Sequence, residues 1–78
     1  MMITLDEICT LVQLQLGLQQ VDGADHIFED LGADSMDAVN IIATAEEKYD
    51  IEIEEDELVR IHTVLDLYTL IQERKTAV

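Results

Sequence analysis

Apolar residues recur at helical spacing in the first part of the chain, and they predict an amphipathic helix. Thr4 stands before this stretch and Glu7 follows three residues later, which is the arrangement of a capping box. Gly17 is the expected terminator, because glycine readily adopts the left-handed conformation that ends helices. The predicted core stripe is Leu5, Ile8, Cys9, Val12 and Leu16, with Leu11, Leu14 and Leu18 widening the face.

The helical period disappears between residues 19 and 33, and this predicts a long ordered loop. Turn-forming residues interrupt the segment, among them Gly23 and Gly32. A loop of about fifteen residues inside a small domain is unusual and often functional. Four apolar residues are expected to pin it to the core: Val21, Ile27, Phe28 and Leu31.

A second helix is expected to begin at Asp34, which caps its first turn, while Asp37 occupies the reciprocal position of the box. Residues 50–54 then alternate acid and isoleucine, as a strand would. No second strand candidate accompanies them, so an extended connection is expected. The apolar stripe of this helix is Ala38, Ile42, Ala45 and Tyr49, broadened by Val39.

Two further helical stretches complete the chain. Residues 55–60 have the length of one or two turns. Thr63 and Asp66 form the next capping box, and the apolar residues that follow recur at helical spacing. The pattern therefore predicts an all-α fold in a single domain over residues 1–78. We expect a small four-helix bundle of three main helices and one short helix, with a long first loop.

Acidic residues dominate the charge of the chain and are concentrated in its middle. The 78 residues contain 18 Asp and Glu against 4 Lys and Arg, which is a net charge of −14. Fourteen of the acids and a single base, Lys48, lie in residues 22–57, which is a local charge of −13. Such a surface excludes nucleic acid as a partner, because phosphate contacts need clustered Lys and Arg, and it disfavours membrane contact. A basic protein surface is the expected partner.

Other totals exclude further classes. At 49% hydrophobic, the chain is too apolar to be an acidic disordered tail. No uncharged run approaches the roughly 20 residues of a membrane span, and the first residues lack the basic stretch of a signal peptide. A single cysteine, Cys9, excludes an internal disulfide and fits the reducing cytoplasm. We expect the protein to be a monomer.

The sequence lacks recognisable motifs for catalysis or metal binding. Ser35 does not lie in a G-x-S-x-G motif, and neither His26 nor His62 has a recognisable relation to it. The acids between Asp50 and Ile61 do not fit an EF-hand loop, which needs glycine at its sixth position and glutamate at its twelfth. We therefore expect a protein that is not itself an enzyme and has no specific metal site.

Ser35, at the expected start of the second helix, suits a phosphate. The first N–H groups of a helix have no intrahelical acceptor, and the helix dipole places partial positive charge there. An anion at this end is typically favoured by about 0.3–1 kcal/mol. The alternative is that Ser35 merely caps the helix, which is the commonest role of serine at such a position. Spacing alone leaves both interpretations open.

The residues around Ser35 add a more specific signal. Residues 29–39 read E-D-L-G-A-D-S-M-D-A-V, which closely resembles the prosthetic-group attachment motif of acyl carrier proteins. The likeness covers the whole chain in length, acidity and helix order. It implies a four-helix bundle in which Ser35, next to Asp34, receives 4′-phosphopantetheine from coenzyme A through a separate holo-carrier synthase. The thiol of this arm then carries acyl groups as thioesters between the enzymes of fatty acid biosynthesis.

The resemblance also implies roles for other side chains. In the family, the second helix and the residues after it present acids and small apolar groups to basic patches on synthases, reductases and acyltransferases. The matching partner-binding positions are Met36, Asp37, Val39, Ala43, Glu46, Glu47, Ile53 and Asp56, together with Asp34. The family shelters its acyl chain between helices, and the expected pocket lining is Ile42, Ile53, Ile61 and Leu65.

Four departures from the family pattern point to a specialised carrier as an alternative, for a polyketide or another secondary acyl pathway. An alternative from a different class is an acidic protein-interaction domain without a prosthetic group, and modification of Ser35 would exclude it. The departures are Asn40 for a common Glu, Ile27 for a usual Phe that is displaced here to Phe28, Tyr49 for a frequent Phe, and Glu54 for a frequent Pro.

Overall fold

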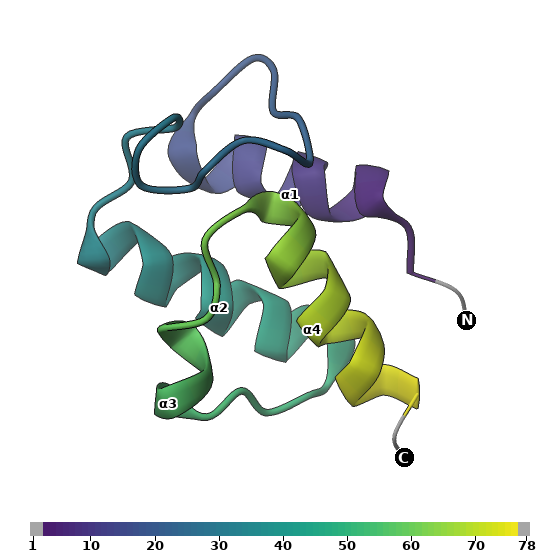
Figure 1. Ribbon diagram of the computed structural model, residues 1–78. Helices are drawn as coiled ribbons and strands as arrows, with labels where there is room; N and C mark the ends of the chain where they lie inside the picture. The colour runs from purple at the N-terminus through teal and green to yellow at the C-terminus, as the bar shows by residue number, and fades with distance from the viewer. Residues whose placement is uncertain (1–2, 77–78) are drawn as a thin grey trace.

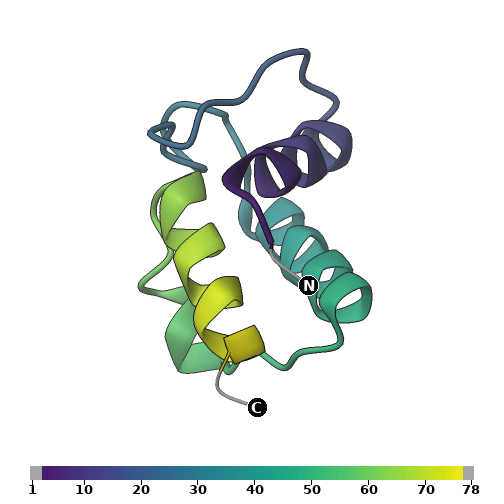
Figure 2. The same ribbon diagram turned by 90° about the vertical axis from the view of Figure 1, so that its right-hand side faces the viewer.

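Three helices pack against one another, and a fourth, short helix lies in the connection between the last two of them. The computed structural model describes residues 3–76, which form α1 (Leu5–Leu16), α2 (Ser35–Tyr49), α3 (Glu55–Leu58) and α4 (Val64–Thr76) (Figure 1). α1 contacts both α2 and α4, and α2 contacts α4. In the turned view of Figure 2, α4 lies opposite α2, and α1 lies above α2, beside the upper end of α4. The predicted all-α fold of three main helices and one short helix is confirmed.

Side-chain caps start α2 and α4 at the predicted residues. The Asp34 carboxylate accepts the Asp37 N–H at 2.8 Å, and the Asp37 carboxylate accepts the Asp34 N–H at 3.2 Å. Thr63 and Asp66 form the same reciprocal pair before α4, at 3.1 and 3.0 Å. Each pair satisfies N–H groups that have no partner inside the helix, which explains why both helices begin where the sequence predicts.

The start of α1 differs from the expected capping box. Thr4 Oγ1 accepts the Glu7 N–H at 3.2 Å, as predicted. The Glu7 carboxylate, however, accepts the hydroxyl of Tyr49 from α2 at 3.2 Å instead of returning to Thr4. Only half of the box forms, because a residue distant in sequence takes the carboxylate. At the other end of α1, Gly17 adopts φ 68° and terminates the helix as expected.

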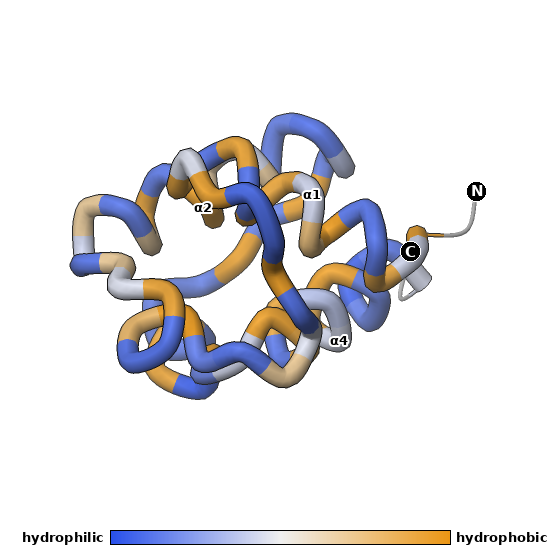
Figure 3. The backbone as a smooth tube through the Cα atoms, turned by 90° about the horizontal axis from the view of Figure 1, so that it is seen from above, coloured by the Kyte–Doolittle hydropathy of each residue, from blue (hydrophilic) through white to orange (hydrophobic). Residues whose placement is uncertain are grey.

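The core lies between α1, α2 and α4 and is mainly aliphatic. In Figure 3, apolar and polar residues alternate along the helices, as amphipathic helices require. Ile41 belongs to the core although the predicted stripe omitted it. Leu14, expected to widen the apolar face of α1, is 76% exposed, because it lies about 200° of helical rotation from Val12. The fully buried larger side chains are Ile8, Ile41, Leu67, Ile71, Val12 and Val64.

The long loop between α1 and α2 is tied to the start of α4. Val21 and Ile27 are buried, as predicted, whereas Phe28 is 40% exposed. Gly23 is buried against Leu5, where an added Cβ would lie 2.8 Å from the Leu5 Cδ2. The loop is thus held in place by packing and by its backbone. Three backbone hydrogen bonds fasten it: Leu65 N–H to Gly23 O (2.9 Å), Val64 N–H to Asp25 O (3.1 Å) and Ile27 N–H to His62 O (2.8 Å).

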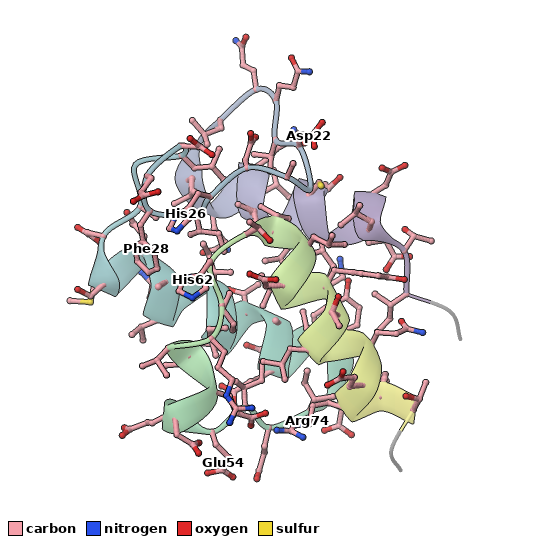
Figure 4. All side chains as sticks on the ribbon, viewed as in Figure 1. Asp22, His26, Phe28, Glu54, His62 and Arg74 are labelled. Carbon is pink, nitrogen blue, oxygen red and sulfur yellow. The ribbon has the colours of Figure 1, made fainter. Side chains whose placement is uncertain are left out.

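The connection from α2 to α3 is extended, as predicted, and side chains hold it in place. The Ile53 N–H donates to the Glu46 carboxylate at 2.9 Å. Arg74, near the end of α4, forms an ion pair with Glu57 of α3, and its Nε donates to the Glu52 carbonyl at 3.2 Å (Figure 4). The hydrogen bond from Arg74 lowers the pKa of the Glu57 carboxyl. These contacts attach α3, which contains no buried residue, to α4.

Candidate functional site

Ser35 is the first residue of α2 and is exposed to solvent. The preceding residue, Asp34, directs its carboxylate to the N–H of Asp37. The N–H groups of Ser35 and Met36 lie in the first turn and have no acceptor within the helix. An anion attached to Ser35 would therefore meet these N–H groups and the positive end of the helix dipole. No basic side chain is needed for this position to accept a phosphate.

A predominantly apolar cavity of about 400 Å³ lies beside Ser35. Its walls come from the long loop, α2, α3 and the segment up to and including α4, so that no single element defines it. Ser35 itself is part of the lining, which places its side chain at the edge of an apolar space. The complete lining is Ile27, Phe28, Ser35, Ala38, Val39, Ile41, Ile42, Leu58, Val59, Ile61, His62 and Leu67.

Two of the four residues expected to line an acyl pocket border this cavity. Ile42 and Ile61 are part of the lining, and both are buried. Ile53 and Leu65 do not border this cavity. Ile53 is half-buried in the connection between α2 and α3. Leu65 is 47% exposed, because it follows the fully buried Val64 and is turned by about 100° from the buried stripe of α4.

Exposed apolar side chains surround the opening of the cavity. Phe28, Val39 and Val59, which we call the rim, each border the cavity and are each at least 40% exposed. Met36 of α2 is 69% exposed one residue after Ser35. Exposed apolar groups gathered beside a cavity are typical of surfaces that contact ligands or proteins.

His62 borders the same cavity as Ser35, a relation that the sequence did not reveal. Its ring centroid lies 5.7 Å from that of His26, which in turn lies 6.2 Å from that of Phe28 (Figure 4). The His62 N–H donates to the Asp66 carboxylate at 3.0 Å. The two histidines meet only because the long loop folds back on the segment before α4. No local motif could have indicated this pairing.

The predicted partner-binding residues differ in how exposed their side chains are and in whether their carboxylates are already hydrogen-bonded within the fold. Glu47 and Asp56 are exposed acids. Asp37 and Glu46 are half-buried, and their carboxylates accept backbone N–H groups within the fold. Asp34, although exposed, has its carboxylate in the cap of α2. The apolar members that are exposed are Met36, Val39 and Ala43, whereas Ile53 is half-buried.

The described residues do not favour metal binding or thiol chemistry. Within residues 3–76, no group of three or more His, Cys, Asp and Glu side chains is arranged to hold a metal ion. Burial, followed by the nearby charge of Asp6, raises the pKa of the Cys9 thiol. A thiol with a raised pKa stays protonated and is a poor nucleophile. No helix in the described range is long and apolar enough to cross a membrane.

Comparison with known proteins identifies the family to which this chain belongs. Residues 6–71 match the PP-binding family model, described as a phosphopantetheine attachment site. The chain is therefore a protein with a domain for phosphopantetheine attachment. It is 42% identical over 72 residues to an acyl carrier protein of Chlamydia trachomatis serovar D, with 90% of this chain and 94% of the relative covered. This chain belongs to the acyl carrier protein family.

Two solved structures share the fold. An acyl carrier protein from Thermotoga maritima superposes with a TM-score of 0.78 at 24% identity, over 92% of this chain and 86% of that chain. The oxytetracycline acyl carrier protein superposes with a TM-score of 0.79 at 23% identity, over 99% of this chain and 86% of that chain. The helix order and the long first loop described above are thus an arrangement that acyl carrier proteins adopt.

Proposed function

We propose that Ser35 is the residue that receives 4′-phosphopantetheine, and that the protein carries acyl groups without being an enzyme itself. The main support is the exposed Ser35 at the start of α2, which lies inside the matched family region and beside the apolar cavity. The N–H groups of Ser35 and Met36 would face the phosphodiester, and the residues present therefore fit the group. When bound, the arm supplies a thiol that holds an acyl group as a thioester.

The lining of the cavity supports an aliphatic cargo, and hence a role in fatty acid biosynthesis. Ten of the twelve lining residues are apolar, Ser35 and His62 being the exceptions. Each CH₂ group of a saturated chain would gain up to about 0.8 kcal/mol on burial here. A poly-β-keto chain carries many carbonyl groups, which would lose their hydrogen bonds to water in such a space. The competing proposal is a carrier for a polyketide or another secondary acyl pathway, and the fold is shared with the oxytetracycline acyl carrier protein.

The acidic and apolar surface around Ser35 supports docking on basic partner proteins. The partners are a holo-carrier synthase and acyl-processing enzymes, which would contact the exposed acids Glu47 and Asp56 and the apolar Met36 and Val39. Exposed charges at the edge of a protein interface raise association rates more than affinity, which suits a carrier that must also dissociate. The single free cysteine, Cys9, supports a reducing compartment such as the cytoplasm.

Intact-mass measurement tests the attachment. The protein is incubated with coenzyme A and a broad-specificity phosphopantetheinyl transferase, and we expect the mass of one phosphopantetheine to be added. Ser35→Ala should add none, whereas Thr69→Ala, which removes another exposed hydroxyl, should be modified like the wild type. An unchanged wild-type mass beside an active control carrier would instead support an acidic interaction domain without a prosthetic group.

A series of loaded cargoes tests the pathway. Saturated acyl chains of increasing length, and a poly-β-keto chain of similar length, are attached through the arm, and thermal unfolding is followed. We expect the saturated chains to raise the midpoint progressively until the cavity is filled, because ligand bound to the native state stabilises it. The polar chain should give a smaller shift. Equal shifts for both cargoes would contradict an aliphatic specificity.

A further inference from the structure

The side chain of His26 performs an unusual task in the long loop. Its Nδ1 accepts the backbone N–H groups of Phe28 at 3.2 Å and of Glu29 at 3.1 Å. In the opposite direction, the Asp30 carboxylate accepts the His26 N–H at 2.7 Å. The arrangement resembles a capping box, but the reciprocal carboxylate comes from the fourth residue on instead of the third, and an imidazole nitrogen takes the place usual for the oxygen of Ser, Thr, Asn or Asp. The turn that begins at His26 is therefore closed both by the ring nitrogen and by the His26 carbonyl, which accepts the N–H groups of Asp30 at 2.9 Å and Leu31 at 3.1 Å.

This turn carries two of the residues that line the cavity. Ile27 is buried in the cavity wall, and its N–H donates to the His62 carbonyl at 2.8 Å. Phe28 belongs to the rim, and its ring centroid lies 6.2 Å from that of His26 (Figure 4). Any change that opens the turn at His26 therefore moves one wall and one rim residue of the cavity.

We propose that His26 is a positioning residue for the cavity, and that its imidazole holds Phe28 of the rim in place only while Nδ1 is unprotonated. In neutral imidazole one ring nitrogen accepts and the other donates, but in the cation both donate. Protonation would place an N–H at Nδ1 opposite the N–H groups of Phe28 and Glu29, so both hydrogen bonds would be lost. Uptake of a proton at Nδ1 then loosens the attachment of Phe28.

The groups facing the imidazole come from two segments. Within the turn, Glu29 Oε2 lies 3.9 Å from His26 Nε2, and the Asp30 carboxylate holds the backbone N–H of His26. From the segment before α4, the His62 ring lies at 5.7 Å, with its own backbone N–H on Asp66. A protonated His26 thus has a carboxylate partner in Glu29 towards which it can turn, and its other neighbour is the His62 ring.

Amide hydrogen exchange by NMR on the unmodified chain tests the proposal, from about pH 8 to about pH 5. Protection of the Phe28 and Glu29 amides, corrected for intrinsic exchange, should fall about fivefold or more on acidification. This is the factor expected when one cap interaction is lost. His26→Ser keeps an oxygen cap that does not titrate, and its protection should stay constant. His62→Gln should retain the fall seen in the wild type.

Three results would overturn the proposal. One is protection in the wild type that does not depend on pH. Another is an equal fall in His26→Ser, which would make Asp30 or Glu29 the titrating group. The third is a fall that disappears in His62→Gln, which would assign the proton to His62. The effect on cargo rests on the proposed carrier function, but the exchange measurement uses no prosthetic group, so the two proposals fail independently.

Discussion

The carboxylate of Glu46 accepts the backbone N–H of Ile53 at 2.9 Å. Glu46 stands in the last turns of α2, and Ile53 lies in the extended connection that follows. The bond therefore holds this connection against the helix. It also gives the Ile53 N–H, which lies outside any helix, a hydrogen-bond acceptor. Glu46 was expected only as a docking acid, but the structure gives it a second task. Its neighbour Glu47 is exposed and has no such task among the described residues.

The pair Glu46→Ala and Glu47→Ala should separate docking from folding. We expect Glu46→Ala to lower the free energy of unfolding by about 1 kcal/mol, because the Ile53 N–H loses its acceptor. Glu47→Ala should stay within about 0.5 kcal/mol of the wild type, as exposed substitutions usually do. Urea unfolding measures both. Equal stability of the two variants would contradict a structural role for Glu46.

Charge reversal at Glu47 should change docking alone. Glu47→Lys is expected to slow modification by a holo-carrier synthase several-fold at low salt, because steering towards a basic partner surface is weakened. The difference should shrink as ionic strength rises and screens the charges. Stopped-flow or single-turnover rates at several salt concentrations provide the measurement. A slowing that does not depend on salt would argue against electrostatic steering.

Tyr49→Phe should weaken the contact between α1 and α2. The Tyr49 hydroxyl donates to Glu7 at 3.2 Å, and its loss should cost about 1 kcal/mol in unfolding free energy. Burial, followed by the hydrogen bond to Glu7, raises the pKa of Tyr49 above its ordinary 10.0. The stabilisation by the Tyr49 hydroxyl is therefore present below about pH 10 and is lost at higher pH. The free energies of unfolding of the wild type and the variant, measured as a function of pH, should converge there.

A second tyrosine offers the control for this measurement. Tyr68→Phe removes a hydroxyl from a half-buried residue of α4. No side-chain hydrogen bond of Tyr68 is found within residues 3–76, so little stability should be lost. An equal loss of unfolding free energy in both variants would show that the hydrogen bond between Tyr49 and Glu7 does not itself stabilise the fold.

Asp66→Asn should destabilise the start of α4 in a manner that depends on pH. Backbone hydrogen bonds from Thr63, and then from His62, lower the pKa of Asp66 below its ordinary 3.8, against the effect of its partial burial. The wild-type contribution is thus present above about pH 3.8 and is lost as pH falls through the lower native value. Urea titrations should show a loss of about 1 kcal/mol near neutrality that narrows in acid. A difference in unfolding free energy between the wild type and Asp66→Asn that grows in acid would contradict this prediction.

Filling the cavity should abolish stabilisation by cargo. Ala38 is half-buried and lines the cavity, whereas Ala43 on the same helix is exposed. We expect Ala38→Leu to remove most of the thermal shift produced by a saturated acyl chain, because the added side chain occupies the same space. Ala43→Leu is the matched control and should retain the shift. Leu65→Ala should retain it too, since Leu65 does not border the cavity. A full shift in Ala38→Leu would place the chain elsewhere.

Much of this fold could be predicted because its signals are local. Asp34 with Asp37, and Thr63 with Asp66, set the starts of two helices through bonds that span three residues. Gly17 ends the first helix through its own backbone preference. The attachment motif around Ser35 is likewise contiguous, and it coincides with a helix start that suits a phosphate.

The helical period also explains the positions of three further apolar residues. Leu14 lies off the stripe of α1, and Leu65 off the stripe of α4, by rotations that the helical period already defines. Ile41 has the spacing of its neighbours in the core of α2 and should have joined the predicted stripe. At each of these positions, helical phase decides burial, and apolar character alone does not.

The sequence by itself determined the helices, their caps, the charge of the middle segment and the position of Ser35. Only the tertiary structure decided what lies beside that serine. The cavity joins residues from the loop, α2, α3 and the segment leading into α4, and the pairing of His26 with His62 depends on the loop folding back. The diversion of Glu7 to Tyr49 arises in the same way. Contacts between distant segments follow from the packing of whole faces, and no short stretch of residues encodes them.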